Sequence, residues 1–372
     1  MRTIMALLSS IALLTSLTGC ASAPSAPAGG PPIPPSAITT VLDKAGSFLM
    51  MAEDSSGGLW IAYPAGLKHF DGKAWKDISK ANGLASQKIT CMIIDRRDNV
   101  WVGTGTNWDF SGDGIFRWDG KAWTRYTTRD GLSSNTVLTL YEDHAGNIWA
   151  GALNGICKFD GKVWTSITKE TGRWLPRQVL DDGKGRIWIG DFTGVTKIEG
   201  GKATKMTEVP TFSMAVDSKG NLYCAHYLAQ YSKYDGSQFV TASLVKGISK
   251  NLLPSPGETR AVVMVTKKDI VWYASRLPVT NVLTAEAGTF KYEKGAWTQI
   301  GTKDGLPWPR VVYGIKEDSR GNIWVLTAWG VCRFDGKSWL SLEGGASNFI
   351  FADSKGNIWL NNKGLVKISP GF

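Results

Sequence analysis

The sequence predicts an all-β chain folded as a single β-propeller, most simply with eight four-stranded blades, although seven is the alternative. One motif carries this prediction: Asp-x-x-Gly-Asn, with an aromatic residue six positions after the Asp, as in Asp353–Trp359. The motif recurs about every 42 residues, which is the length of a propeller blade. The 43 Gly and 17 Trp among 372 residues also fit many short strands joined by tight turns.

Residues 1–19 are predicted to be a signal peptide. A basic start precedes an apolar stretch, residues 4–17, that is too short to span a membrane. The sequence Leu-Thr-Gly-Cys ending at Cys20 resembles the bacterial lipobox, in which cleavage precedes the Cys and lipid is attached to its sulfur. We therefore expect a lipoprotein; an ordinary signal peptide that contains a Cys is the alternative. Residues 20–36, rich in Pro, Ala and Ser, are predicted to be a tether.

Residues 37–372 are predicted to be the propeller domain, in which each unit supplies four strands. An apolar first strand leads into the Asp turn, and the second strand carries the aromatic residue. The third strand ends in Asp-Gly, a strong two-residue hairpin signal, and a fourth strand with another Trp follows. The second-strand aromatics are Trp60, Trp101, Trp149, Trp188, Tyr223, Trp272, Trp324 and Trp359.

The last unit runs to Phe372 without a fourth strand, and the β-rich segment Ile38–Leu42 precedes the first unit. We therefore expect the N-terminal segment to complete the last blade, which would remove two free sheet edges. The fifth and sixth units depart most from the pattern, so a seven-bladed arrangement is kept as the alternative.

The pattern D-x-x-G-N-I-W-V-G…G-I-x-x-F-D-G-K-x-W-T…D-G-L resembles the two-component regulator propeller repeat, over about residues 38–372. That repeat builds periplasmic sensor domains of bacterial hybrid histidine kinases. The resemblance implies a propeller fold and a role in ligand sensing. It does not identify a ligand, because function depends on sites placed on a fold.

Residues repeated in every unit are interpreted as structural, because every blade must pack on the next. Function is expected where the units differ, in the loops between second and third strands and between blades. Indole faces stack on sugar rings and Arg guanidinium groups bind carboxylates. Capping of the blade ends is the alternative role for these Trp residues. The candidate ligand-binding residues are Trp108, Asp109, Arg173, Trp174, Arg177, His226, Tyr227, Trp308, Arg310 and Trp329.

These features predict a monomeric, lipid-anchored sensor propeller that binds an oligosaccharide or cell-wall-type ligand. One alternative is a non-catalytic scaffold that binds an envelope protein. Another is a propeller glycosidase or lyase, in which two acids, or an acid and His226, would have to converge. The sequence favours a protein that is not an enzyme and assigns no catalytic residue, because nucleophile-elbow, zinc-protease and phosphate-loop patterns are missing from it.

The formal charge of +10 comes from basic residues spread along the chain, so nucleic acid is not an expected partner. We expect the protein to be exported and lipid-anchored in the bacterial envelope. If the organism has an outer membrane, we expect the protein on that membrane, facing the periplasm or the cell surface. No cofactor or metal is expected. Calcium is left open, although the Asp turns lack the later bidentate Glu of an EF-hand. The remaining cysteines are expected to be buried free thiols: Cys91, Cys157, Cys224 and Cys332.

Overall fold

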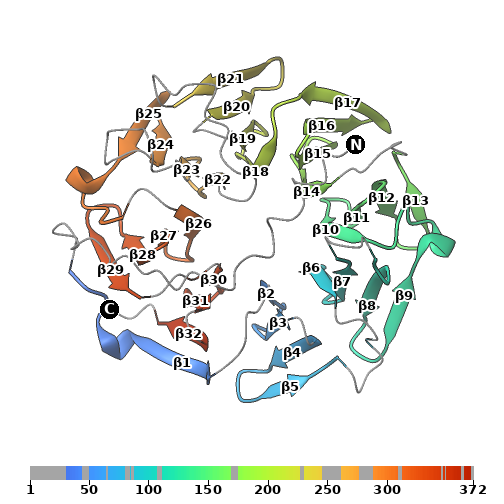
Figure 1. Cartoon of the computed structure of the whole chain (residues 1–372), viewed down its shortest axis with the longest axis horizontal. Coiled ribbons are helices and arrows are strands. Elements are labelled where there is room, and N and C mark those ends of the chain that lie inside the picture. The colour runs from blue at the N-terminus through green and yellow to red at the C-terminus, as the bar shows by residue number, and fades with distance from the viewer. Residues whose placement is uncertain are drawn as a thin grey trace, which may run out of the picture. The chain divides into compact units, whose positions relative to one another are not determined.

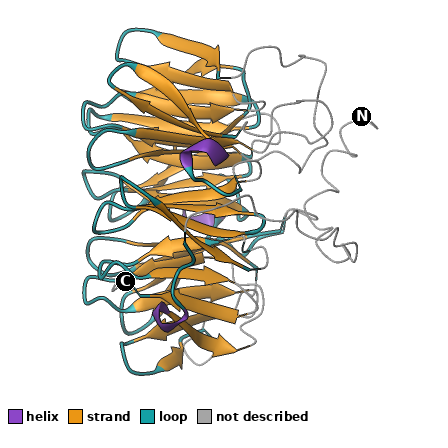
Figure 2. Cartoon of the chain, turned by 90° about the vertical axis from the view of Figure 1, so that its left-hand side faces the viewer, coloured by secondary structure: helices purple, strands orange, loops and turns teal. Residues whose placement is uncertain are grey.

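The structure is a computed structural model that describes most of the chain after residue 30. The described residues are 31–43, 50–63, 66–79, 84, 88–106, 111–168, 175–226, 230–244, 261–275, 288–308, 312–344, 347, 349–361 and 364–369. Strands joined by short turns dominate these residues (Figure 2). Their helical pieces are three-residue 3₁₀ turns, Pro35–Ala37, Thr128–Asp130 and Thr302–Asp304.

The described strands form eight four-stranded antiparallel sheets, each with its strands in chain order except the last (Figure 1). These sheets are the predicted blades, so the eight-bladed fold class is confirmed and the seven-bladed alternative is wrong. The chain divides into two compact units. One covers residues 45–212, and the other combines residues 213–372 with the N-terminal segment up to residue 44.

The 45–212 unit holds blades 1 to 4. Their strands are β2 (Met50–Glu53), β3 (Leu59–Tyr63), β4 (Gly66–Phe70) and β5 (Trp75–Asp77); β6 (Ile89–Ile94), β7 (Val100–Thr104), β8 (Ile115–Trp118) and β9 (Trp123–Tyr126); β10 (Val137–Glu142), β11 (Ile148–Ala152), β12 (Gly155–Phe159) and β13 (Trp164–Ser166); β14 (Pro176–Asp181), β15 (Arg186–Asp191), β16 (Gly194–Glu199) and β17 (Lys202–Thr207).

The 213–372 unit holds blades 5 to 8, although β18 begins just before its boundary. Their strands are β18 (Thr211–Val216), β19 (Leu222–His226), β20 (Gln230–Tyr234) and β21 (Phe239–Ser243); β22 (Ala261–Val265), β23 (Val271–Ser275), β24 (Thr289–Glu293) and β25 (Ala296–Ile300); β26 (Val312–Glu317), β27 (Ile323–Thr327), β28 (Gly330–Phe334) and β29 (Trp339–Glu343); β30 (Ile350–Ala352), β31 (Ile358–Asn361), β32 (Gly364–Ile368) and β1 (Ile38–Asp43).

The N-terminal strand completes the last blade, as the sequence predicts. Strand β1 pairs antiparallel with β32, with Ile38 opposite Ile368 and a register irregularity between Thr40 and Leu42 (Figure 1). Blade 8 therefore has the order β1-β32-β31-β30. The pairing gives β32 a hydrogen-bonded neighbour on both sides, which is the physical benefit expected of closure.

The chain is already packed against the domain before the predicted boundary at residue 37. The Ile33 amide donates to the Ser341 carbonyl at 2.8 Å, and the Ser341 amide donates to the Pro31 carbonyl at 3.2 Å. Ile33 is 1% exposed, in a core cluster that includes Trp324 and Ile358. Residues 31–33 thus pair with Ser341 in the outer strand of blade 7, and Pro35–Ala37 form a 3₁₀ turn, whereas the sequence assigned residues up to 36 to the tether. Residues 1–30 lie outside the described residues, so the signal peptide, Cys20 and the rest of the tether stay predictions.

Six of the second-strand aromatics share a core cluster with residues of the next blade, as predicted: Trp60, Trp101, Trp149, Tyr223, Trp272 and Trp324. Trp101 of blade 2 is 2% exposed and shares a core cluster with Val137 and Ile148 of blade 3. Its ring contacts Phe159 and Trp164 edge-on, at centroid distances of 5.4 and 6.1 Å. Edge-on aromatic pairs of this kind add to the stabilisation from apolar burial. These repeated indoles therefore have a structural role in the core.

The spacing of six residues between Asp and aromatic has a hydrogen-bonding cause. In blade 2, the Asp95 carboxylate accepts the Trp101 indole N–H at 2.8 Å and the Asn99 side-chain amide at 2.8 Å. The Asn99 backbone amide donates to the same carboxylate at 2.9 Å. Buried polar groups need hydrogen-bond partners, and this one carboxylate is the acceptor for the N–H groups of both the turn and the indole. The same Asp–Trp bond recurs at Asp54, Asp143, Asp182, Asp318 and Asp353.

Blade 1 shows how a departure from the motif is compensated. Gly58 stands where most other units have Asn, and the His69 Nε2 atom lies 2.9 Å from the Asp54 carboxylate in place of the missing amide. A Cβ atom at position 58 would come within 2.4 Å of that nitrogen. Burial raises the pKa of Asp54, but hydrogen bonds from Ser56, Trp60, the Gly58 amide and His69 outweigh it, so the pKa lies below its usual value.

Candidate ligand-binding site

The strand registers define two ends for each blade. Pro176 pairs with Asp191, and Val312 pairs with Thr327, so the first strand begins where the second strand ends. The connection from the preceding blade and the turn between second and third strands therefore share one end, here called the loop end. The Asp turn and the Asp-Gly turn share the opposite end, here called the Asp-turn end.

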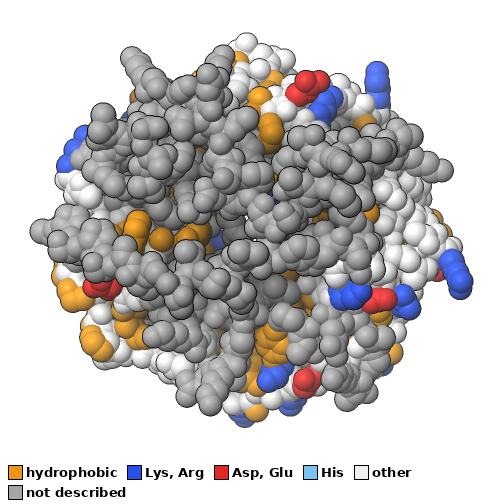
Figure 3. Space-filling model, in the orientation of Figure 1, with side chains coloured by type: hydrophobic (Ala, Val, Ile, Leu, Met, Phe, Trp, Pro, Cys, Tyr) orange, Lys and Arg blue, Asp and Glu red, His pale blue; other side chains and the backbone are white. Residues whose placement is uncertain are grey.

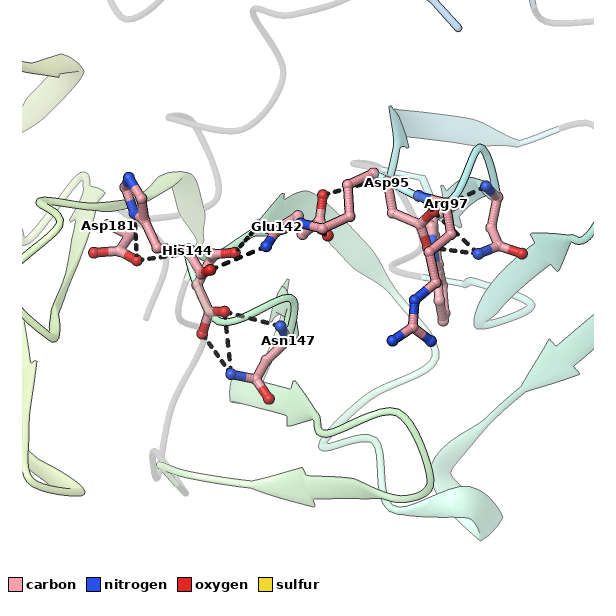
Figure 4. A network of polar contacts seen from close by, with 10 residues as sticks. Asp95, Arg97, Glu142, His144, Asn147 and Asp181 are labelled. Atoms are coloured by element: carbon pink, nitrogen blue, oxygen red, sulfur yellow. Dashed lines mark hydrogen bonds and ion pairs between the residues drawn. The ribbon is translucent and has the colours of Figure 1, made fainter. Parts of the chain in front are cut away.

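Polar groups at the Asp-turn end bind neighbouring blades to each other. The Arg96 amide donates to Glu142 at 3.0 Å and its guanidinium forms an ion pair with the same carboxylate at 2.8 Å. One blade further on, the His144 amide and Nδ1 lie 2.9 and 2.8 Å from an Asp181 carboxylate oxygen (Figure 4). Burial raises the pKa of Asp181, but these His144 contacts and the Gly183 amide outweigh it and lower the pKa.

The 213–372 unit repeats this arrangement. The Ser218 amide donates to Asp269 and the Lys267 amide donates to Glu317, each at 2.8 Å. In these four blades the residue after the motif position thus donates its backbone amide to an acidic side chain of the next blade. Because these groups hold neighbouring blades together, their side chains are constrained by the fold and are poorly suited to ligand recognition. This favours the loop end as the place for function.

The structure describes four of the ten predicted ligand-binding residues, Arg177, His226, Trp308 and Trp329, and all four belong to the loop ends of their blades. The others lie outside the described residues: Trp108, Asp109, Arg173, Trp174, Tyr227 and Arg310.

Trp308 and Trp329 pack in the same core cluster at the loop end of blade 7. Trp308 is 6% exposed, and Trp329 is half-buried against the core cluster to which Trp308 belongs. Hydrophobic side chains are visible on this face at the position of β26–β28 (Figure 3). Trp308 thus has the alternative role given above, a structural one at the end of a blade. Trp329 is the residue of the two whose side chain is partly exposed and could contact a ligand.

The turn that carries Trp329 is held by Thr327. The Thr327 hydroxyl accepts the amides of Trp329 and Gly330, both at 3.2 Å, and donates to the Gly330 carbonyl at 2.9 Å. Gly330 has a φ of 158° and could not carry a Cβ, which would lie 2.1 Å from the Leu342 carbonyl oxygen. A half-buried indole on so constrained a turn loses little conformational entropy when a ligand binds.

His226 is placed inside blade 5. It is fully buried, and its Nε2 lies 2.6 Å from the Ser232 hydroxyl, which in turn lies 2.7 Å from the Thr241 hydroxyl. The Tyr273 hydroxyl donates to the His226 carbonyl at 3.1 Å. A His–Ser contact occurs in hydrolases, but this pair has no surface through which a polymer could reach it. The geometry therefore gives His226 a structural role.

Arg177 lies at the surface on an aromatic pair. Its guanidinium carbon is 4.2 Å from the centroid of the Phe192 ring and 5.7 Å from that of Phe212, and the two rings meet edge-on at 6.0 Å. Phe192 is half-buried in the turn between β15 and β16. Sequence reasoning missed both Phe residues; the available signal was the turn Asp-Phe-Thr-Gly, Asp191–Gly194, which places an aromatic where other units differ.

The described residues contain no group of three or more His, Cys, Asp or Glu side chains that could hold a metal ion. The four cysteines after Cys20 are free thiols, three of them buried and Cys91 half-buried. Burial raises the pKa of each thiol, to about 12 for Cys91. Among the described residues, no helix is long and apolar enough to cross a membrane.

A family model described as two component regulator propeller matches residues 83–106 and 131–154. No curated protein matches the chain. The solved structures that are similar to it include the following three. The first is the extracellular domain of a putative hybrid two-component system from B. thetaiotaomicron, with 19% identity and a TM-score of 0.49. The alignment covers 88% of this chain and 52% of that one, so the chain spans about half its length.

The second is virginiamycin B lyase from Staphylococcus aureus, with 12% identity, a TM-score of 0.50 and coverage of 89% of this chain and 98% of that one. The third is YCF48 bound to a D1 peptide, with 12% identity, a TM-score of 0.50 and coverage of 77% and 93%. Identities this low show a shared propeller fold and nothing more specific.

Proposed function

Because the chain contains repeats of the two-component regulator propeller family, we propose that it is a ligand-binding propeller of the sensor type in the bacterial envelope. Its ligand is an oligosaccharide or a cell-wall-type fragment, bound at the loop end of the blades. The lipobox-like sequence before Cys20 supports anchoring through lipid.

The observation that carries this proposal is the contrast between the two ends of the blades. The Asp-turn end repeats the same bonds from blade to blade, as at Arg96–Glu142 and His144–Asp181. The loop end instead differs from blade to blade and exposes aromatic surface on rigid turns, as at Trp329 and Phe192. Aromatic faces of this kind stack on the apolar faces of sugar rings.

The burial of His226 argues for binding without catalysis. The enzyme alternative needed either two converging acids or an acid with this imidazole at the surface of the site. Burial of the side chain beside Ser232 argues against the second arrangement. The similarity to virginiamycin B lyase concerns the fold alone. A protein partner at the loop end is the second candidate, because a propeller of similar fold is known in a complex with a peptide.

A thermal-shift screen of the full chain in mild detergent tests the proposal. The ligands are neutral glycans, uronates and peptidoglycan fragments, each checked afterwards for cleavage. We expect a saturable rise in Tm with at least one intact glycan, because binding to the native state stabilises it. Trp329→Ala should weaken that binding about tenfold, through loss of the stacked indole.

Trp75→Ala is the matched control, because Trp75 is also half-buried but begins a fourth strand at the Asp-turn end. It should leave ligand affinity unchanged. Equal losses in the two variants would contradict a site at the loop end. Cleavage of the glycan would replace binding with catalysis. The absence of any shift would favour the protein-partner alternative.

A further inference from the structure

Two basic side chains approach one turn at the loop end of blade 4, each from one of the two outer strands of the sheet. The turn joins β15 to β16 at Asp191–Gly194. In the strand order β14-β15-β16-β17, Arg177 lies on β14 and Lys205 lies on β17. Both side chains are exposed, so the two outer strands of this blade each bring a cation to the turn between the inner strands.

Each cation is positioned by a residue at the tip of the turn. The Arg177 guanidinium lies 4.2 Å from the Phe192 ring centroid. The Lys205 ammonium donates to the Thr193 hydroxyl at 2.5 Å. Phe192 and Thr193 are consecutive, so the two charges are held over neighbouring residues. The ring contact positions the guanidinium group, and the fork of N–H donors that any guanidinium carries suits a carboxylate.

The acids near this turn have different surroundings. Asp191 is fully buried, and its carboxylate accepts the Thr193 amide and hydroxyl at 2.5 and 2.6 Å. The Asp191 carboxylate lies 3.8 Å from the Lys205 ammonium, so it partly balances the positive charge of Lys205. Glu208 is exposed, and its Cα lies close to Gly194, so its carboxylate would oppose an anionic ligand.

We propose that this turn is a subsite for a carboxylated sugar unit, with Arg177 and Lys205 binding the carboxylate and Phe192 packing against the ring. The inference rests on the proposed function and narrows its ligand class to acidic oligosaccharides. This turn combines aromatic surface with two cations held beside the consecutive residues Phe192 and Thr193. At the turn of blade 7, the proposed ligand contact is the Trp329 indole.

Trigalacturonate and its fully methyl-esterified form are the probes, because they share a shape and differ in charge. Binding to the full chain is measured by calorimetry at low and physiological salt. We expect the acid to bind at least tenfold more tightly than the ester, and the difference to shrink as salt is added. Arg177→Gln and Lys205→Gln should each weaken binding of the acid about tenfold and leave that of the ester unchanged. Glu208→Gln should strengthen binding of the acid severalfold.

Arg125→Gln is the control, because Arg125 is an exposed Arg that lies 5.6 Å from the Phe116 ring on another blade. It should leave both affinities unchanged. Equal binding of acid and ester, or an equal loss in Arg125→Gln, would overturn the acidic subsite while leaving the proposed function intact. If neither probe binds and the neutral glycans and peptidoglycan fragments of the screen also fail, both proposals are wrong.

Discussion

Asp143→Ala is expected to lower the free energy of unfolding by about 3 kcal/mol, because it removes a charged acceptor from several buried donors at once. The Asp143 carboxylate accepts the Trp149 indole N–H at 2.7 Å. It also accepts the backbone amide and the side chain of Asn147, which is labelled in Figure 4, both at 2.8 Å. Trp149 is 5% exposed, so its N–H has no water to replace the lost acceptor. Urea denaturation followed by tryptophan fluorescence measures the change.

Asp160→Ala in the same blade is the control for this prediction. Its carboxylate also caps a turn, accepting the amides of Lys162 and Val163, but these groups are exposed and water can replace it. The loss of stability should be much smaller than at Asp143. Similar losses at the two positions would show that turn capping, rather than the bond to the buried indole, explains the repeated Asp.

Ile33→Asp is expected to destabilise the protein by about 3 kcal/mol, because it places a charge in an apolar core. Ile33 is 1% exposed and packs with Ala37, Trp324 and Ile368. Ile33→Val removes one methylene and should cost about 1 kcal/mol. Chemical denaturation of both variants gives the comparison. If residues 31–36 were a free tether, both substitutions would leave stability unchanged.

The blades could be predicted because the repeat reports on local structure. Turn residues and alternating apolar residues specify each strand without reference to distant parts of the chain, so the units from Trp60 to Trp359 are found where the period places them. Closure by Ile38–Asp43 could also be predicted, because an incomplete last unit requires a strand from elsewhere. Ile33 was missed, because it is the one Ile, Leu, Val, Phe or Met among residues 20–36.

The candidate site was harder to predict, because burial at the loop end depends on tertiary packing. Trp308 and Trp329 look alike in sequence, yet one lies in the core and the other is half-exposed. His226 ends a strand beside a variable loop, but its side chain turns inward to Ser232. The approach of Lys205 to Thr193 joins a fourth strand to a turn twelve residues earlier, which strand periodicity does not reveal.

Hydrogen exchange of the full chain with and without a bound glycan from the screen tests the central claim most directly. If the ligand binds at the loop end, amides of the turns at residues 191–194 or 327–330 should gain protection. Amides of the Asp turns, such as residues 143–147 and 318–322, should then exchange at unchanged rates. Protection confined to the Asp turns would contradict the account, because it would place the ligand on the end that holds the blades together.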